Sequence, residues 1–277
     1  MKNILLFIAL AILGTAMMKN NQLNMTYLGN CGFLYESGKD KVIIDPFGTE
    51  FGNYFQLPSE NTKENIIAGK APFDKVDLLL ITHIHGDHFN AKLTEYFLLN
   101  NSNAKMICPR QVYNQLKDSC SNFAQIESRI ISPDLSFNES KQIKINGLTV
   151  QAIRMQHGTD RNLDGIHYSD YTEYEKTENL GYVINFNNKR VFHQGDGCLR
   201  INKKAVEKID GTIDVAYLGY FDWDAASLNI LKNELKAKNV IFMHGTIPGQ
   251  EQKSEEFKKI ASQLLFFDKE PECKTFR

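Results

Sequence analysis

Residues 82–89 read THIHGDHF, and this short stretch places three histidines and an aspartate in one turn. Polar and charged groups held so closely are costly to bury unless something binds them, and a metal ion is the simplest candidate. The apolar run Val76–Thr82 predicts a buried strand just before them. In an extended backbone residues i and i+2 point to the same side, so His83 and His85 can reach one ion.

Gly86 permits a sharp turn after this pair and can direct Asp87 and His88 toward a neighbouring position. One loop therefore offers four ligands to two adjacent metal sites. Four ligands do not complete two sites, so we expect more from elsewhere in the chain. Three further histidines, each at the end of a predicted strand, are candidates by position: His157, His193 and His244.

Composition narrows the possible partners and ligands. The chain has 277 residues, 42% hydrophobic and 23% charged, as expected for a folded globular protein. Its net charge of −1 shows no global basic field of the kind that attracts nucleic acid. Its five cysteines form no CxxC or CxxxC pair, so we expect histidines and carboxylates to hold any metal.

The N-terminal residues have the pattern of a secretory signal peptide. Lys2 precedes an apolar run, Ile4–Leu13, and small residues follow at Gly14-Thr15-Ala16. We expect cleavage after Ala16, which makes residues 1–16 the signal peptide and residues 17–277 a single exported domain, periplasmic or secreted. A buried first helix and an uncleaved anchor are the alternatives, although the run is short for a membrane span.

The remaining pattern predicts strands first and then strands alternating with helices. Two β-rich stretches, each followed by helices, indicate two packed sheets with helices outside. The predicted strands are Met25–Leu28, Gly32–Tyr35, Lys41–Ile44, Val76–Thr82, Ala104–Cys108, Lys141–Ile145, Leu148–Ile153, Leu180–Phe186, Lys189–His193, Ile213–Leu218 and Val240–Met243. The predicted helices are one beginning at Ala91 with Asn90 as its cap, then Arg110–Leu116, Ile201–Ile209, Ala225–Ala237 and Ser254–Leu265. Phe47–Lys70 and Gly158–Asn179 read as long loops, candidate lids over a site.

The ordered motifs of the chain resemble the metallo-β-lactamase superfamily. The HxHxDH motif stands as His83-x-His85-x-Asp87-His88, and His157, Asp196 and His244 follow in the family's order. Further matching stretches are IIDP at 43–46, HQGD at 193–196 and MHGT at 243–246. The resemblance runs from about Thr26 to about Gly249 and is closest to stand-alone metal-dependent hydrolases that include ascorbate-phosphate lactonase-like proteins.

This resemblance implies an α/β fold, a four-layer αββα sandwich with two metal ions between the sheet edges. His83, His85 and His157 would hold the first ion. Asp87, His88 and His244 would hold the second, and Asp196 would bridge the two. Asp45 would orient a ligand histidine from behind. His193 is interpreted as a supporting residue, His167 as structural, and Cys198 as a small buried hydrophobe.

Such a pair of ions activates a bridging hydroxide for hydrolysis at neutral pH, with Asp87 orienting it and passing protons. Histidine and aspartate ligands suit zinc, and also manganese and iron. An aspartate at the bridging position argues against a β-lactamase. We expect cleavage of a small ester, lactone or phosphoester. The alternatives are a phosphodiesterase or nuclease of the same fold, a non-catalytic metal-binding or ligand-binding protein, and a redox role.

The two loops suggest the substrate class. They carry aromatic residues that can contact an apolar group, namely Phe51, Tyr54, Phe55, Tyr168, Tyr171 and Tyr174, and Phe221 and Trp223 can add to the same wall. Gly158–Asn179 holds six acidic residues against Arg161 and Lys176, and an acidic lid repels a polyanion. We therefore expect a small-molecule substrate, no nucleic acid partner, and membrane contact only through the signal segment.

Overall fold

The computed structural model describes residues 22–52, 54–158, 176–186, 188–222, 224–244, 262–267 and 269–276. The predicted signal peptide, His167, the loop tyrosines Tyr168, Tyr171 and Tyr174, and Trp223 lie outside these residues. Within the described ranges, none of the helices combines the length and apolar character needed to cross a membrane.

Two mixed sheets form the centre of the fold. The first has the strand order β13-β1-β2-β3-β4-β5-β6, and the second has the order β12-β11-β10-β9-β8-β7. The strands of the first are β1 (Leu23–Gly29), β2 (Gly32–Ser37), β3 (Asp40–Ile44), β4 (Leu78–Leu80), β5 (Lys105–Ile107), β6 (Ile130–Ile131) and β13 (Glu272–Phe276). Those of the second are β7 (Ser140–Ile145), β8 (Leu148–Gln156), β9 (Glu178–Phe186), β10 (Lys189–His193), β11 (Val215–Leu218) and β12 (Asn239–Phe242).

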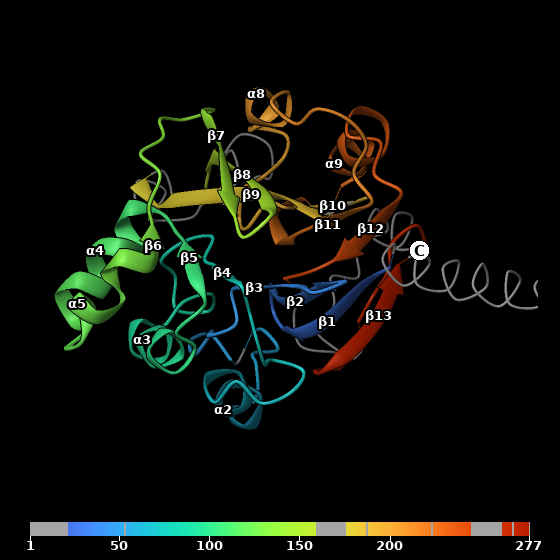
Figure 1. Cartoon of the computed structure of the whole chain (residues 1–277). Helices are drawn as coiled ribbons and strands as arrows, with labels where there is room; N and C mark the ends of the chain where they lie inside the picture. The colour runs from blue at the N-terminus through green and yellow to red at the C-terminus, as the bar shows by residue number, and fades with distance from the viewer. Residues whose placement is uncertain are drawn as a thin grey trace, which may run out of the picture.

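Helices cover the outer face of each sheet (Figure 1). On the first sheet lie α2 (Glu60–Ile67), α3 (Ala91–Asn100), α4 (Arg110–Ser119) and α5 (Phe123–Ile126), with a 3₁₀ turn at Glu127–Arg129. On the second lie α8 (Lys203–Val206) and α9 (Ala225–Asn229), which continues as a π-helical turn at Ile230–Glu234; a 3₁₀ turn spans Tyr220–Asp222. The predicted αββα sandwich is confirmed.

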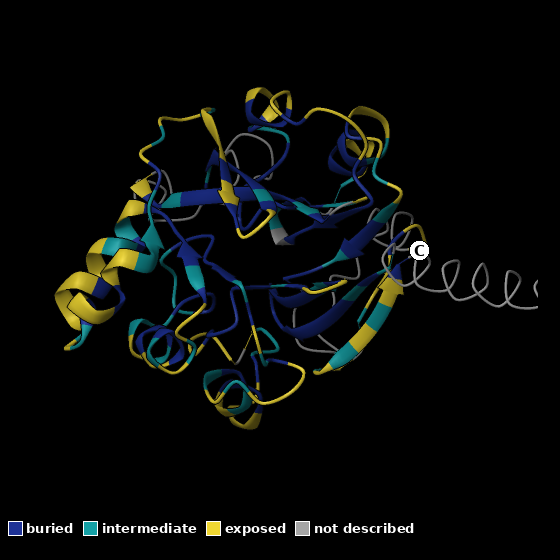
Figure 2. Cartoon of the chain, in the orientation of Figure 1, coloured by how far each residue is buried: buried dark blue, intermediate teal, exposed yellow. Residues whose placement is uncertain are grey.

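Three apolar clusters fill the spaces between these four layers. In β4, Leu78 and Leu80 belong to the cluster between the sheets, whereas Leu79 belongs to the cluster beneath the helices. Neighbouring residues of a strand point to opposite faces, so a strand covered on both sides must be apolar throughout. The inner strands are accordingly buried, whereas the outer helix faces and much of the edge strands β7 and β13 are exposed or half-buried (Figure 2).

Some predicted elements differ from the structure. Phe47–Lys70 is not simply a loop, because it contains α2, which Ser59 caps by accepting a hydrogen bond from the Thr62 N–H at 3.3 Å. Ile66 anchors that helix in the cluster beneath it. Most of the predicted helix Ser254–Leu265 lies outside the described residues, and its end is not helical, since Leu265 forms a bridge with Ile241.

The strand ends bring the polar residues of the sequence motifs to one edge. β3 and β4 are parallel neighbours, so Asp45 and the motif that begins after Leu80 leave the first sheet side by side. Two hydrogen bonds from β9 of the second sheet hold that motif: Tyr182 Oη donates to the Ile81 carbonyl at 2.7 Å, and Leu180 N donates to the Thr82 carbonyl at 2.9 Å. The two sheets therefore fix the motif together.

A pair of tyrosine hydroxyls also joins the two sheets. Tyr35 of β2 and Tyr217 of β11 are fully buried, and their Oη atoms lie 2.9 Å apart. Each hydroxyl satisfies the other in an otherwise apolar cluster. Removing one of them leaves the other buried without this partner, which costs more than removing both.

We expect Tyr35→Phe and Tyr217→Phe each to lower the free energy of unfolding by about 1–3 kcal/mol. The double variant should lose clearly less than the sum of the two single losses, as urea denaturation can measure. Tyr113→Phe is the control, because its hydroxyl bonds Glu127 at an exposed position, and it should change stability by less than about 0.5 kcal/mol. Strictly additive losses in the double variant would contradict the coupling.

Candidate metal centre

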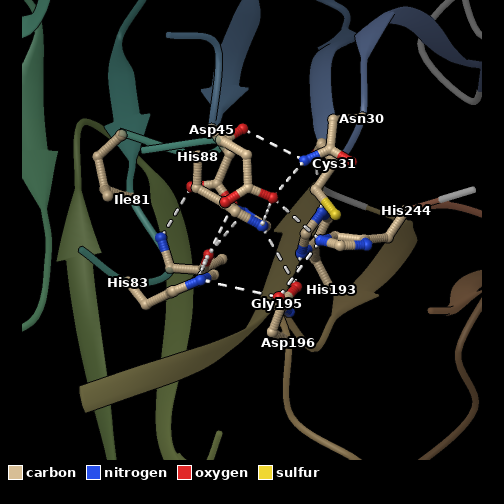
Figure 3. Close-up of polar contacts among 12 residues, drawn as sticks. Asn30, Cys31, Asp45, Ile81, His83, His88, His193, Gly195, Asp196 and His244 are labelled. Carbon is tan, nitrogen blue, oxygen red and sulfur yellow. Dashed lines mark hydrogen bonds and ion pairs between the residues drawn. The ribbon is translucent and has the colours of Figure 1, made fainter. Parts of the chain in front are cut away.

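All seven residues that the sequence predicted as metal ligands lie together at this edge. Their potential ligand atoms form overlapping groups, within each of which all the atoms lie within 4.8 Å of one another. The groups are His83, His85 and His157; His83, Asp87 and His88; and Cys31, His88, Asp196 and His244. Figure 3 shows how His83 and His88, from the loop after β4, point toward Asp196, which follows β10, and His244, which follows β12.

Asp196 lies between the two sets of histidines. One carboxylate oxygen, Oδ2, is 3.8 Å from His83 Nε2, 3.6 Å from His157 Nε2 and 3.3 Å from His244 Nε2. The other, Oδ1, is 3.3 Å from His88 Nε2. Asp196 thus faces members of both predicted ligand sets, the position that a bridging carboxylate needs.

Asp45 and Thr82 set the orientation of two ligand rings from behind. His88 Nδ1 lies 2.8 Å from Asp45 Oδ2, and His83 Nδ1 lies 3.0 Å from Thr82 Oγ1. The Thr82 hydroxyl donates to Asp45 Oδ2 at 2.6 Å, so it accepts from the His83 ring. Both rings therefore carry their proton on Nδ1 and, when neutral, turn the lone pair of Nε2 inward.

These inward nitrogens provide the test of whether a metal fits. Nε2 of His83 and Nε2 of His88 are buried and have no hydrogen-bond partner among the described residues. Carboxylate oxygens lie near both, but at 3.3 Å or more and outside hydrogen-bond geometry. Buried polar atoms are rarely left in this way. A cation between the nitrogens and the carboxylates satisfies both, so the residues fit a divalent metal.

Asn30, in the turn between β1 and β2, positions Asp87. Its Nδ2 donates to the Asp87 main-chain carbonyl at 3.2 Å and to Asp87 Oδ2 at 3.1 Å. The same carboxylate oxygen lies 3.2 Å from His244 Nε2. Asp87 is thereby held toward His244, as the predicted second ligand set requires.

The turn that carries Asp196 is held by Asn179 of β9. Its Oδ1 accepts from the Asp196 N–H at 3.1 Å, and its Nδ2 donates to the Gln194 carbonyl at 2.9 Å. Gly195 has a φ of +59°, and a Cβ there would approach Asn179 Oδ1 to 2.4 Å. Gly195 is therefore required for this close turn.

His193 lies behind the cluster and belongs to none of the three groups of potential metal donors. Its Nδ1 accepts from the Gly195 N–H at 3.1 Å, so its Nε2 donates to the Cys31 carbonyl, 3.0 Å away. Burial lowers the pKa of His193 to about 4, which keeps the ring neutral. This arrangement agrees with its interpretation as a supporting residue.

Burial and charge act in opposite directions on the ionisable groups of the cluster. Burial alone would raise the pKa of Asp196, but the surrounding histidines, His244 and His88 first, hold it well below its usual range. Burial lowers the pKa of His85 to about 4. Asp196 is therefore ionised and His85 neutral at physiological pH, the states in which each can bind a cation.

Two predicted aromatic residues flank the histidines. The Phe55 ring lies against the His244 ring, with centroids 4.2 Å apart, and the Phe221 ring lies 6.0 Å from that of His157. Phe51 and Tyr54 are 52% and 60% exposed, so they are available at the surface of this loop. Cys198 is buried, as predicted, and belongs to none of the ligand groups.

Sequence reasoning missed Asn30, Thr82 and Cys31 as parts of this site. Thr82 was within the decisive stretch, but its role depends on Asp45 approaching from another strand. Asn30 and Cys31 stand in Gly29-Asn30-Cys31-Gly32, and the polar residues between two glycines were the available signal for a tight turn.

Comparison with known proteins identifies the family. The model of the β-lactamase superfamily domain matches residues 41–245, which include all seven predicted ligands. The chain belongs to this superfamily. It is 25% identical over 245 residues to a UPF0173 metal-dependent hydrolase of Pyrococcus furiosus, covering 86% of this chain and 92% of the relative.

Solved structures share the fold. Igni18, described as a metallo hydrolase of Ignicoccus hospitalis, matches with a TM-score of 0.62 and 21% identity over 93% of this chain and 99% of its own. The metallo-β-lactamase fold protein YhfI of Bacillus subtilis matches with a TM-score of 0.60 and 10% identity over 92% and 99%. The chain thus stands among proteins named metal-dependent hydrolases and has the metallo-β-lactamase fold, as predicted. The likeness to ascorbate-phosphate lactonases stays a prediction.

We expect Asp45→Asn to weaken metal binding about 10–100-fold, because His88 loses the carboxylate that fixes its ring and tautomer. Chelator competition with zinc-loaded protein measures this affinity. The matched control is Asp222→Asn, which alters another fully buried carboxylate, bonded to the Leu199 N–H at 3.0 Å and to Ser227 Oγ at 2.6 Å. The control should lose stability and keep its metal affinity. Equal loss of affinity in both variants would contradict the role of Asp45.

Proposed function

We propose that this protein is a hydrolase that uses two divalent metal ions to cleave a small ester, lactone or phosphoester. One observation carries the proposal: the buried Asp196 carboxylate faces histidines of two ligand sets, at 3.3–3.8 Å. A single ion has no use for a carboxylate shared between two ligand sets, whereas such a carboxylate suits a pair of ions about 3.5–4 Å apart. The names of the relatives, metal-dependent hydrolases, support the reaction class.

We propose that the ligands divide between the two ions as the resemblance implies. His83, His85 and His157 would hold the first ion, since their ligand atoms form one group. Asp87, His88 and His244 would hold the second, because Asp87 Oδ2 lies 3.4 Å from His88 Nε2 and 3.2 Å from His244 Nε2. Zinc suits this set, and manganese and iron are also compatible with it.

Bound together, the ions would supply a hydroxide at neutral pH and stabilise negative charge on the attacked oxygen. The chain itself positions the reacting groups. Asp87 would hold the proton of the attacking water, since its carboxylate is fixed by Asn30 and stays ionised; burial opposes that ionisation, but His88 and His244 outweigh it and keep its pKa below the usual range. Asp45 holds the His88 ring in place and would thereby keep the ligand geometry fixed while negative charge develops on the attacked oxygen.

The flanking aromatic rings favour a substrate with an apolar part. Phe55 beside His244 and Phe221 beside His157 would form two sides of its binding site. We propose a small or medium organic molecule and no nucleic acid partner, because a net charge of −1 gives the chain no global basic field to attract a polyanion. We also propose export of residues 17–277 after signal peptide cleavage.

The experiment compares metal-loaded full-length protein on matched panels of lactones, carboxylic esters, phosphodiesters and RNA. We expect turnover of a lactone or small ester that chelation abolishes and zinc restores. Asp87→Asn should lower kcat by about 10²–10⁴-fold, while Asp118→Asn, an exposed site on α4, leaves it unchanged.

Two outcomes would overturn the proposal in different ways. Efficient RNA cleavage with little action on small esters would replace the proposed substrate class by a nuclease. Metal binding without turnover of any member of the panels would favour a non-catalytic binding protein.

A further inference from the structure

Cys31 lies at the metal centre although the sequence favoured ligands other than cysteine. It follows Asn30 in the turn between β1 and β2, where Gly29 and Asn30 have positive φ values of 110° and 50°. This left-handed turn brings Cys31 to the edge where the motif histidines lie. The His193 ring holds its main chain by donating to the Cys31 carbonyl at 3.0 Å. A residue of the opposite sheet thus holds the main chain of Cys31 in place.

The Cys31 sulfur belongs to a complete set of metal donors. Its Sγ and ligand atoms of His88, Asp196 and His244 all lie within 4.8 Å of one another. Thiolate, imidazole and carboxylate are all donors that zinc binds, with sulfur about 2.3 Å and nitrogen about 2.0–2.1 Å from the ion. Figure 3 shows the sulfur on the His244 side of the cluster.

A second observation points to a ligand at the same place. His88 Nε2 is fully buried and makes no hydrogen bond in the described part of the chain, although its Nδ1 is fixed by Asp45 at 2.8 Å. The ring therefore aims an unsatisfied nitrogen at the space that Cys31 and Asp196 border. A cation in that space satisfies the nitrogen, the carboxylate and the sulfur together.

Packing alone explains Cys31 less well. A small buried cysteine often serves as an apolar residue, and Cys31, 1% exposed, does touch the cluster between the sheets. Cys108 shows that role in this chain: it is fully buried in the cluster beneath the helices and belongs to no donor group. Cys31 instead borders two imidazoles and a carboxylate, which are poor surroundings for an apolar side chain and the kinds of donor with which cysteine shares metal sites.

We propose that Cys31 is a thiolate ligand of the ion that His88 and His244 hold, giving that ion a mixed sulfur, nitrogen and oxygen set. The proposal rests on the metal centre described under the proposed function and adds to it a ligand from outside residues 41–245, the part that the family model matches. A thiolate favours zinc or iron over manganese at this position, while the first ion keeps three histidines.

The test uses full-length protein loaded with Co²⁺, whose absorption reports binding and sulfur coordination separately. The wild type should show d–d bands that titrate to about two ions and an intense near-ultraviolet sulfur-to-cobalt charge-transfer band. Cys31→Ser should lose the charge-transfer band and keep d–d bands, and its zinc affinity should fall at least about tenfold in chelator competition. Cys108→Ser is the control and should keep the charge-transfer band.

X-ray absorption of the wild-type zinc protein needs no variant and should show sulfur at about 2.3 Å from zinc. Two bound ions with neither a charge-transfer band nor a zinc–sulfur distance would overturn the role of Cys31 and leave the proposed hydrolase intact. Absence of any bound ion would overturn the metal centre itself, and with it this proposal. A band that survives in Cys31→Ser and disappears in Cys108→Ser would assign the sulfur elsewhere.

Discussion

The close approach of one buried carboxylate to four imidazole rings is the constraint on which this structure depends. Asp196 is 7% exposed, and His83, His88, His157 and His244 surround it at 3.3–3.8 Å. Taking such groups out of water is costly unless each finds a partner of opposite charge or a metal. The proposed pair of cations would supply that compensation, because it would bind the inward nitrogens and the carboxylate together.

The sandwich provides what this cluster needs, because each of its polar residues follows a strand that is buried on both faces. The strands fix where each loop begins, and the loops carry the polar side chains from there to the cluster. Backbone conformation shows the cost of that convergence: Asp45 and His244 have φ values of 43° and 55°, in the left-handed region that such residues adopt infrequently. Strain of this kind persists only where the surroundings impose it, and it gathers at functional sites. At Asp45 the imposing contacts are the hydrogen bonds to Thr82 and His88.

Local pattern was sufficient to predict two packed sheets with helices outside and the four motif residues His83, His85, Asp87 and His88, whereas the remaining ligands, His157, Asp196 and His244, came from the resemblance to the superfamily. Short apolar, β-rich runs bounded by turn residues predict buried strands, and two histidines two residues apart at a strand end are expected to point to the same side. The resemblance also implied Asp45 as a supporting residue, and the structure places it at the end of β3, parallel to β4, which carries the motif. Contacts between residues far apart in the sequence could not be predicted from local pattern. Asn30 bonds Asp87, 57 positions away, and β13 pairs with β1 from the other end of the chain. The helix α2 was missed because its surroundings are rich in turn residues, although Ser59 was a valid cap signal.

The most direct test of the account is the metal content of full-length protein purified without chelator and reconstituted with zinc, manganese or iron. The account predicts about two ions per chain in the wild type. Because Asp196 lies between both ligand sets, Asp196→Ala should lower the occupancy of both ions, whereas His85→Ala should lower that of one. A stoichiometry that stays near zero after reconstitution, or an Asp196→Ala variant that keeps both ions, would contradict it.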